Sequence, residues 1–143
     1  MRTKFHGLTS LGLIFFAIFL AVFFAWQIDL WLALGYVVFV LLAFAIVIVA
    51  YCAKCPCKAN CAHVIPGWLA QVVDRQPGPY SRTELVLLVV SLALVLLLPN
   101  FWLGSIPLWL AIYWLAVILG VIQIRSFVCK PCGNIFCPLN RRQ

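Results

Sequence analysis

Long apolar segments alternate with short polar ones along this chain. Four segments carry no charged residue, and they cover 8–27, 30–51, 85–103 and 106–124. Each is close to the ~20 residues that an α-helix needs to cross the ~30 Å hydrocarbon core of a bilayer. The period-two alternation that marks a membrane β-barrel strand is absent from all four. The pattern predicts an all-α integral membrane protein with four transmembrane helices.

Composition leads to the same class. Hydrophobic residues make up 66% of the chain and charged residues 9%, whereas about a quarter of the residues of a soluble domain are charged. Because Arg2 and Lys4 precede the first apolar segment, it also resembles a secretory signal. It is longer than a signal core, and no small-x-small cleavage site follows it. We expect it to stay as a membrane anchor.

The four spans form two hairpins. We expect a single domain over 1–143, with the first hairpin over 1–61, a cytoplasmic or interfacial loop over 62–82 and the second hairpin over 83–143. The loop is too short for a core of its own. Each hairpin ends in a cysteine cluster, and this order suggests a parallel pseudo-twofold repeat that would bring the clusters together at one surface.

Local signals set the helix boundaries. Asp29 and Ser105 are placed to cap the second and fourth helices, and 81–84 has the capping-box pattern. Pro99 should end or kink the third helix near Leu98, because a proline ring clashes with the carbonyl four residues earlier. The last residues of that span would then complete the crossing as a kinked turn or an interfacial segment.

Two features belong to the membrane interface. A short helix over 66–73 would lie on the membrane, with these residues on one apolar face: Trp68, Leu69, Val72 and Val73. Eight aromatic residues could line a quinone or pigment pocket, but several of them fall at span ends, which favours an aromatic belt: Trp26, Trp31, Trp102, Trp109, Trp114, Tyr36, Tyr51 and Tyr113.

The basic residues predict the orientation. All 10 fall on one side of the four-span topology: Arg2, Lys4, Lys54, Lys58, Arg75, Arg82, Arg125, Lys130, Arg141 and Arg142. By the positive-inside rule, both termini and the central loop are cytoplasmic. The net charge of +7 is explained by this topology and by anionic headgroups, so we expect no nucleic-acid partner.

All 7 cysteines lie in two clusters directly after apolar segments: Cys52, Cys55, Cys57 and Cys61, then Cys129, Cys132 and Cys137. Thiols at such close spacing are typical of metal ligands, whereas scattered cysteines are typical of packing. Cytoplasmic thiols are kept reduced, so metal binding or transient redox chemistry is favoured over structural disulfides.

An iron–sulfur centre is the preferred interpretation. The first cluster supplies four thiolates from one loop, the number that such a centre requires. Its spacing is close to the bacterial ferredoxin run Cys-x-x-Cys-x-x-Cys-x-x-x-Cys-Pro but lacks one residue in the middle gap. The second cluster supplies three thiolates and also ends in Cys-Pro. The function we expect is electron relay, or the anchoring of a redox complex at the membrane.

Zinc is the first alternative, in a structural subunit of a membrane assembly. Two Cys-x-x-Cys knuckles would build a four-thiolate site that clamps the hairpins together: Cys52, Cys55, Cys129 and Cys132. The other candidate ligands would complete a site of three thiolates and one imidazole: Cys57, Cys61, Cys137 and His63. Thiolates serve both metals, so this count does not separate zinc from iron.

The second alternative is thiol–disulfide exchange or the handling of a soft metal ion. Lys54, Lys58 and Lys130 would favour a nearby thiolate. Quinone-coupled disulfide-forming membrane enzymes oxidise substrates outside the cytoplasm, so the predicted topology argues against that role. Palmitoylation of the cysteines is the alternative in which they bind no metal and carry out no redox chemistry, although it does not explain the recurrence of Cys-x-x-Cys.

Other function classes lack the residues that they need. The acids Asp29, Asp74 and Glu84 are too far apart for a paired-carboxylate site, and no hydrolase, kinase or nucleotide-binding motif is present. The spans hold no cysteine, histidine or acid that could form an ion path. We expect the bilayer as a partner, with room for a redox or membrane-complex partner at the cytoplasmic face and for a homo-oligomer. As a redox protein, the chain would be an electron-transfer subunit rather than a complete enzyme.

Overall fold

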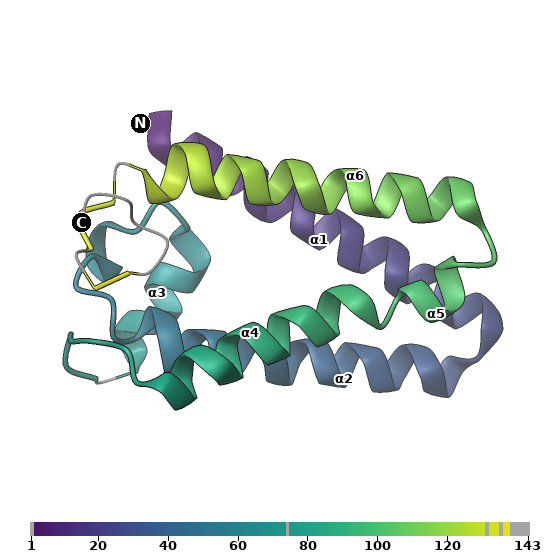
Figure 1. The fold of residues 1–143 in the computed structure, drawn as a ribbon, viewed down its shortest axis with the longest axis horizontal. Coiled ribbons are helices and arrows are strands. Elements are labelled where there is room, and N and C mark those ends of the chain that lie inside the picture. The colour runs from purple at the N-terminus through teal and green to yellow at the C-terminus, as the bar shows by residue number, and fades with distance from the viewer. Residues whose placement is uncertain (1, 74, 131, 135, 138–143) are drawn as a thin grey trace.

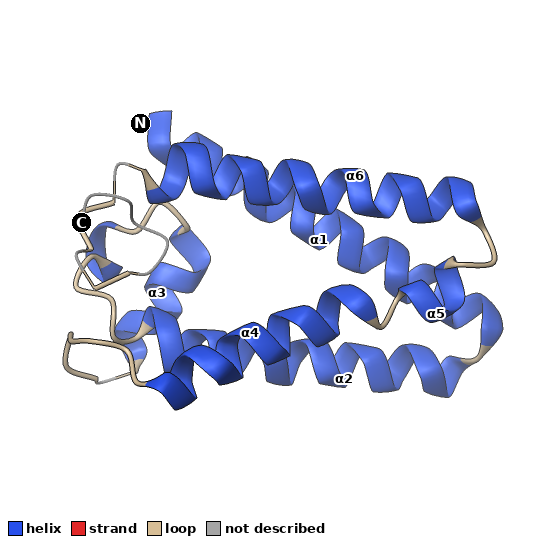
Figure 2. Cartoon of the chain, in the orientation of Figure 1, coloured by secondary structure: helices blue, strands red, loops and turns tan. Residues whose placement is uncertain are grey.

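The structure is a computed structural model that describes residues 2–73, 75–130, 132–134, 136 and 137. All regular secondary structure in that part of the chain is helical (Figure 2). Four long helices run along the long axis (Figure 1): α1 (Arg2–Ile28), α2 (Leu30–Ile46), α4 (Arg82–Leu97) and α6 (Pro107–Gln123). The shorter elements are the π-helices η1 (Val47–Cys52) and η3 (Ile124–Cys129), the 3₁₀ turn η2 (Lys58–Asn60), and the helices α3 (Val64–Val72) and α5 (Asn100–Leu103).

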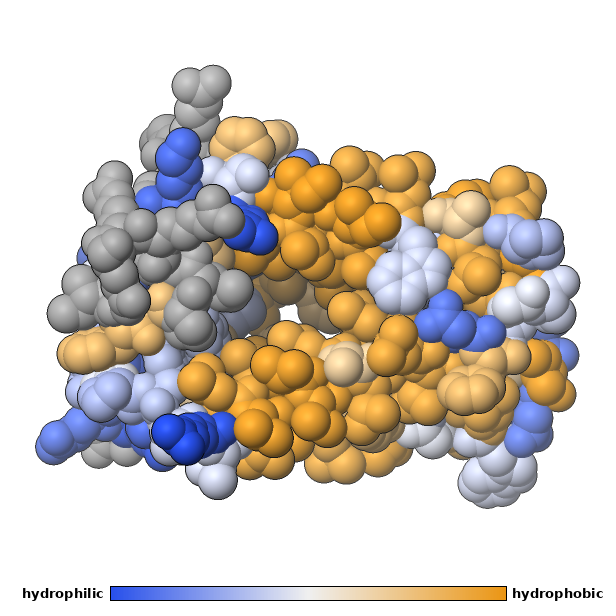
Figure 3. All heavy atoms as spheres, in the orientation of Figure 1, coloured by the Kyte–Doolittle hydropathy of each residue, from blue (hydrophilic) through white to orange (hydrophobic). Residues whose placement is uncertain are grey.

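Four helical stretches are long and apolar enough to cross a membrane: Lys4–Ile28, Leu30–Cys52, Arg82–Leu103 and Pro107–Cys129. They overlap all four spans predicted from the sequence. Apolar side chains cover the middle of the molecule, and hydrophilic ones gather toward its two ends (Figure 3). The all-α class with four candidate membrane helices is therefore confirmed, whereas the side on which the termini lie stays a prediction.

Small residues let α1 and α6 approach closely. Ala17, Ala21 and Ala25 recur every fourth residue along α1 and are buried, as are Ala116 and Gly120 on α6. A Cβ on Gly120 would lie only 3.0 Å from the Cδ1 of an isoleucine on α1. Lipid tails are as apolar as these side chains, so close van der Waals packing rather than the hydrophobic effect drives this association.

The two hairpins pack differently. The helix α1 packs along both α6 and α2, and α2 packs along α4. The helices α4 and α6 of the second hairpin diverge toward the end of the molecule where α3 lies (Figure 1), and the space-filling view shows an opening between them (Figure 3). The cysteine-bearing segments occupy that splayed end. The pseudo-twofold repeat stays a prediction.

Hydroxyl and amide side chains form hydrogen bonds with the backbone carbonyls around a proline break in the third span. The helix α4 ends at Leu97, and α5 resumes after Pro99, which confirms the predicted interruption. Around the break, the Val95 carbonyl accepts from Tyr36 Oη at 2.9 Å, and the Leu96 carbonyl accepts from Tyr113 Oη at 3.0 Å. Asn100 Nδ2 donates to the Leu97 carbonyl at 2.7 Å. These bonds satisfy backbone groups that the hydrocarbon around them cannot.

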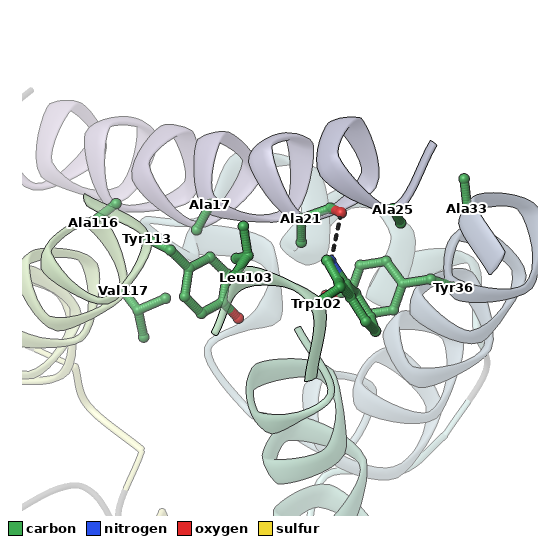
Figure 4. Packing of buried hydrophobic residues seen from close by; sticks show 10 residues of the cluster. All are labelled: Ala17, Ala21, Ala25, Ala33, Tyr36, Trp102, Leu103, Tyr113, Ala116 and Val117. Carbon is green, nitrogen blue, oxygen red and sulfur yellow. Dashed lines mark hydrogen bonds between the residues drawn. The ribbon is translucent and has the colours of Figure 1, made fainter. Parts of the chain in front are cut away.

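The largest buried side chains collect at this break. Trp102 and Leu103 of α5 reach between the other helices, beside Tyr36 and Tyr113 (Figure 4). Trp102 Nε1 donates to the Ala21 carbonyl on α1 at 3.0 Å. Three of the eight aromatic residues considered for a belt or a pocket are therefore core residues: Tyr36, Trp102 and Tyr113. By contrast, Trp26 and Trp31 are 64% and 78% exposed near the turn that joins α1 to α2.

Two of the three predicted caps are present. Asp29 accepts from the Leu32 backbone N–H at 3.3 Å, and Ser81 with Glu84 forms a complete capping box at the start of α4. The predicted cap at Ser105 is wrong, because α6 begins one residue later, after Ile106. Ser105 Oγ instead donates to the Trp102 carbonyl at 2.9 Å and closes the turn after α5.

A helix is present where the sequence predicts one: α3 starts two residues before Pro66, and its position on the membrane surface stays a prediction. Its buried side consists of Gly67 and Ala70. Its exposed apolar residues are Val64, Ile65, Trp68 and Val72. Leu69 and Val73, which the sequence placed on this face, are half-buried. Because a Cβ on Gly67 would lie 2.7 Å from the Cβ of Cys61, glycine allows α3 to pack directly on the first cysteine cluster.

Candidate thiolate metal centre

Both cysteine clusters lie at the same end of the bundle (Figure 1). The first cysteine of each cluster is the last residue of a six-residue π-helix: Cys52 ends η1, and Cys129 ends η3. The structure describes all seven thiols, and none of them is in a disulfide. Cys137 is buried, and the other six are half-buried. Two chain segments about 70 residues apart thus deliver their thiols to one place.

The two Cys-x-x-Cys knuckles have the same backbone turn. The N–H of Cys55 donates to the Cys52 carbonyl at 3.1 Å, and the N–H of Cys132 donates to the Cys129 carbonyl at 3.1 Å. Each knuckle therefore follows a π-helix and folds back by one hydrogen-bonded turn. This repeated geometry matches the pairing of thiolates that a four-coordinate metal site uses.

Backbone amides are directed at three of the sulfurs. Cys55 Sγ accepts from the N–H of Cys57, and Cys61 Sγ accepts from the N–H of His63. Cys132 Sγ accepts in the same way from the N–H of Asn134. In all three cases the donor is two residues further along the chain. Such donors stabilise a thiolate, so they are suited to metal-bound sulfur.

Burial opposes these donors. Burial raises the pKa of the Cys55 thiol to about 11, against the smaller lowering by the Cys57 amide. Burial also raises the pKa values of Cys61 and Cys132. At neutral pH the Cys55 thiol is therefore protonated. A bound cation would supply the missing stabilisation of the thiolates, and its binding would release protons.

Thiols of the two clusters are in contact across the hairpins. The side chains of Cys57 and Cys132 are hydrogen bonded. Consistent with this, Cys57 Sγ lies 3.7 Å from the position that a Cβ on Gly133 would take. Besides burial, a thiolate at Cys132 raises the pKa of Cys55, and a thiolate at Cys61 raises the pKa of Cys129. The tertiary structure thus brings together ligands that the sequence could place only on the same side.

His63 is fixed by α1. Its Nδ1 lies 3.2 Å from the Gly7 carbonyl oxygen, and burial lowers the pKa of the imidazole. As a neutral ring that donates from Nδ1, it keeps Nε2 available as a ligand atom, which is the usual arrangement of metal-binding histidines. Gly7 makes the contact possible, because a Cβ there would collide with the Ala62 carbonyl oxygen.

The lysines of the first cluster are engaged elsewhere. Lys54 Nζ pairs with Glu84 Oε2 at 2.8 Å. Lys58 Nζ donates to the carbonyls of Ala53 and Arg75 at 3.4 and 3.2 Å. These amines fix the loop around the cysteines through bonds to other groups. Activation of a thiolate by Lys54 or Lys58 therefore gains no support from these contacts.

Sequence reasoning missed three side chains that contact the thiols or one another. Tyr51 Oη lies 2.8 Å from Cys137 Sγ, and the Tyr51 ring stacks on Tyr80 with 4.8 Å between centroids. Asn134 contacts both Tyr80 and a cysteine of the other cluster. Asn134 lies within the second cysteine cluster, whereas only the fold brings the two tyrosines together.

No group of three or more His, Cys, Asp or Glu side chains is gathered so that it could hold a metal ion within the described residues. Cys57 and Cys132 are joined by a side-chain hydrogen bond. Pro138, Arg141 and Arg142 lie outside the described residues. The metal interpretation therefore rests on the convergence of the two clusters and on the amides directed at their sulfurs.

Comparison with known proteins finds no matching family model, no matching curated protein and no matching solved structure.

Proposed function

We propose that this chain is a membrane protein that holds a thiolate-bound metal centre at one end of its four-helix bundle, with ligands from both hairpins. The observation that carries this proposal is the meeting of two clusters distant in sequence, with Cys57 hydrogen bonded to Cys132 and amide donors directed at three sulfurs. Thiolates are the ligands that zinc and iron–sulfur centres prefer. The centre forms as binding deprotonates the thiols and draws them together.

An iron–sulfur cluster is the metal group that we propose first. The segment that begins with the last residue of η1 supplies four thiolates. Hydrogen bonds from amides to sulfur are one of the means by which proteins tune the reduction potential of such clusters. In this proposal the protein relays single electrons, or anchors a redox complex, at the cytoplasmic face of the membrane. Zinc, pinning the two hairpins of an assembly subunit, is the alternative that the matching turns of the knuckles favour.

Anaerobic purification, followed by metal analysis and visible absorption spectroscopy, tests the proposal. The expected result is stoichiometric iron and sulfide with a broad visible band that bleaches on reduction. Cys55→Ser and Cys132→Ser should each lose most of the metal, whereas Ser91→Ala, within a span, should retain it. A colourless protein with stoichiometric zinc would overturn electron transfer, and a metal-free protein would overturn the metal centre altogether.

The contact between Cys57 and Cys132 favours a second candidate function, thiol–disulfide exchange. Oxidation of the pair would form one S–S bond and release two protons and two electrons, which a small disulfide such as oxidised glutathione takes up as two thiols. Mass spectrometry of the metal-free protein after such treatment tests this function. The expected product is a reversible cross-link between Cys57 and Cys132, and its absence would eliminate the candidate.

A further inference from the structure

Asn134 is a buried polar residue in the tail of the second hairpin. Only 2% of it is exposed, although it lies in an irregular segment between two cysteines. Its Oδ1 accepts from the Phe136 backbone N–H at 2.9 Å. This bond fixes which way the amide points, because Nδ2 must then face away from the Phe136 backbone. The orientation is therefore set by the local turn within the second cluster.

The amide nitrogen of Asn134 faces the other hairpin. Nδ2 donates to Cys55 Sγ at 3.4 Å and to Tyr80 Oη at 3.1 Å. An amide nitrogen carries two hydrogens, so it can serve both acceptors at once. Cys55 belongs to the first cluster, and Tyr80 immediately precedes the capping box of α4. One side chain thus joins the tail of the second hairpin to the loop between the hairpins.

The hydrogen-bond donor to Cys55 has a chemical consequence. The backbone N–H of Cys57 already donates to this sulfur, and Asn134 adds a donor from a distant part of the chain. Donors to sulfur favour the thiolate over the thiol. Hydrogen bonds to ligating sulfurs also change the metal affinity and the reduction potential of a centre.

The contacts extend from Tyr80 back to the second cluster. The Tyr80 ring stacks on Tyr51, and Tyr51 Oη is 2.8 Å from Cys137 Sγ. Asn134 therefore contacts Cys55, and Tyr51 contacts Cys137. Tyr80 lies between these two side chains and contacts both. Movement of the segment that carries Asn134 would therefore disturb both thiols.

We propose that Asn134 is a positioning residue of the thiolate centre, donating a hydrogen bond to Cys55 Sγ across the hairpins and holding the two cysteine clusters in register. This inference rests on the proposed metal-binding function. It adds to that function a specific residue, a specific sulfur and a specific bond.

Replacement by aspartate tests the proposal. Asn134→Asp keeps the shape of the side chain and the Oδ1 acceptor, but it removes the donor and places a negative charge beside the thiolate. Asn60→Asp is the matched control, because Asn60 is an exposed residue of the same cluster region. Both variants of the full chain, purified in detergent without metal, are titrated with Co²⁺ alone, whose thiolate charge-transfer absorption reports binding.

The expected result is a loss of Co²⁺ affinity of about 10- to 100-fold for Asn134→Asp, the range typical of groups that support metal ligands. The charge-transfer band should also shift, which a merely looser fold would not produce. Asn60→Asp should change the affinity by less than about 3-fold. Equal affinities and identical bands for the two variants would overturn the role of Asn134.

Thiol alkylation of the metal-free protein separates failure of this proposal from failure of metal binding. Iodoacetamide labelling, resolved by mass spectrometry, compares Cys55 with Cys61, whose backbone donor from His63 is unchanged. In Asn134→Asp, the reactivity of Cys55 relative to Cys61 should change, because Cys55 Sγ has lost the hydrogen bond from Asn134 Nδ2. If the parent chain binds no Co²⁺, the metal centre fails, and this ratio alone decides the bond: an unchanged ratio overturns it.

Discussion

Glu84 is the acid that fastens the first cysteine cluster to the membrane helices. Its Oε2 pairs with Lys54, which lies within the cluster, and its Oε1 pairs with Arg75, both at 2.8 Å. Arg75 also donates to the Val49 carbonyl in η1 at 2.9 Å. The Glu84 side chain is 12% exposed, so these pairs are shielded better than surface ion pairs. One carboxylate therefore joins η1, the cysteine loop and the start of α4.

Replacement of Glu84 by glutamine should loosen this end of the bundle. Glutamine still completes the capping box of α4, so the helix end is kept while the charge is lost. The expected decrease in the free energy of unfolding is about 1.5–3 kcal/mol, the range for hydrogen bonds to charged groups. Titration of the detergent-solubilised protein with sodium dodecyl sulfate, followed by circular dichroism, measures it.

Asp29→Asn is the matched control for this substitution. It removes an acid at the opposite end of the molecule, where asparagine caps a helix about as well as aspartate does. Its effect should stay below about 0.5 kcal/mol. If Glu84→Gln were no more destabilising than Asp29→Asn, the ion pairs would contribute nothing to holding the cluster.

At the scale of elements, the broken third span shapes the core. Pro99 has no N–H to offer the Val95 carbonyl, and Tyr36 of α2 donates to it instead. The displaced helix α5 then turns Trp102 and Leu103 inward, where they are buried. Pro99 in the third span thus requires α2 to carry a hydrogen-bond donor, Tyr36, where it meets the Val95 carbonyl.

A double-mutant cycle between Tyr36 and Pro99 measures this dependence. Tyr36→Phe should cost about 1 kcal/mol in the parent chain, because it leaves the Val95 carbonyl without its donor. In a Pro99→Ala background the cost should fall close to zero, since the alanine N–H can donate to the same carbonyl. Unfolding in sodium dodecyl sulfate provides all four free energies. An equal cost in both backgrounds would contradict the account.

At the scale of the whole molecule, charge and sulfur share one end. Lys54 and Lys58 lie within the first cluster, Arg75 of the following loop contacts η1, and η3 brings Arg125 to the same end. The opposite end holds the turn at Asp29 and the turn after α5. This polarity is the structural counterpart of the positive-inside bias.

Labelling with a membrane-impermeant maleimide tests the predicted orientation. All reactive native thiols should label from the cytoplasmic side, in inside-out vesicles, and resist the reagent in intact cells. A Ser105→Cys variant supplies the control, because residue 105 is exposed at the opposite end and should label from outside. Rapid labelling of the native cysteines in intact cells would reverse the orientation and restore disulfide exchange as the leading function.

Part of the site could be predicted from sequence because it depends on the spacing of residues within one segment. The spacing within each cluster indicated the paired turns, and the apolar segments indicated that both clusters share one side. Ser105 shows where the local sequence was insufficient, because either Ser105 or Ile106 could be the residue that precedes the helix. Asn134 and Tyr80 could not be paired from sequence, because 54 residues separate them.

The sequence by itself determined the four helices, the break at Pro99 and the common side of the seven thiols, because hydrophobic length, a missing N–H and charge bias act along the chain. Only the tertiary structure decided that Cys57 meets Cys132, that Asn134 reaches Cys55, and that Tyr36 and Tyr113 are core residues. Those contacts depend on how small residues let α1 and α6 pack and how far α4 and α6 diverge. Packing between distant segments is a property of the assembled bundle, and no spacing within one segment encodes it.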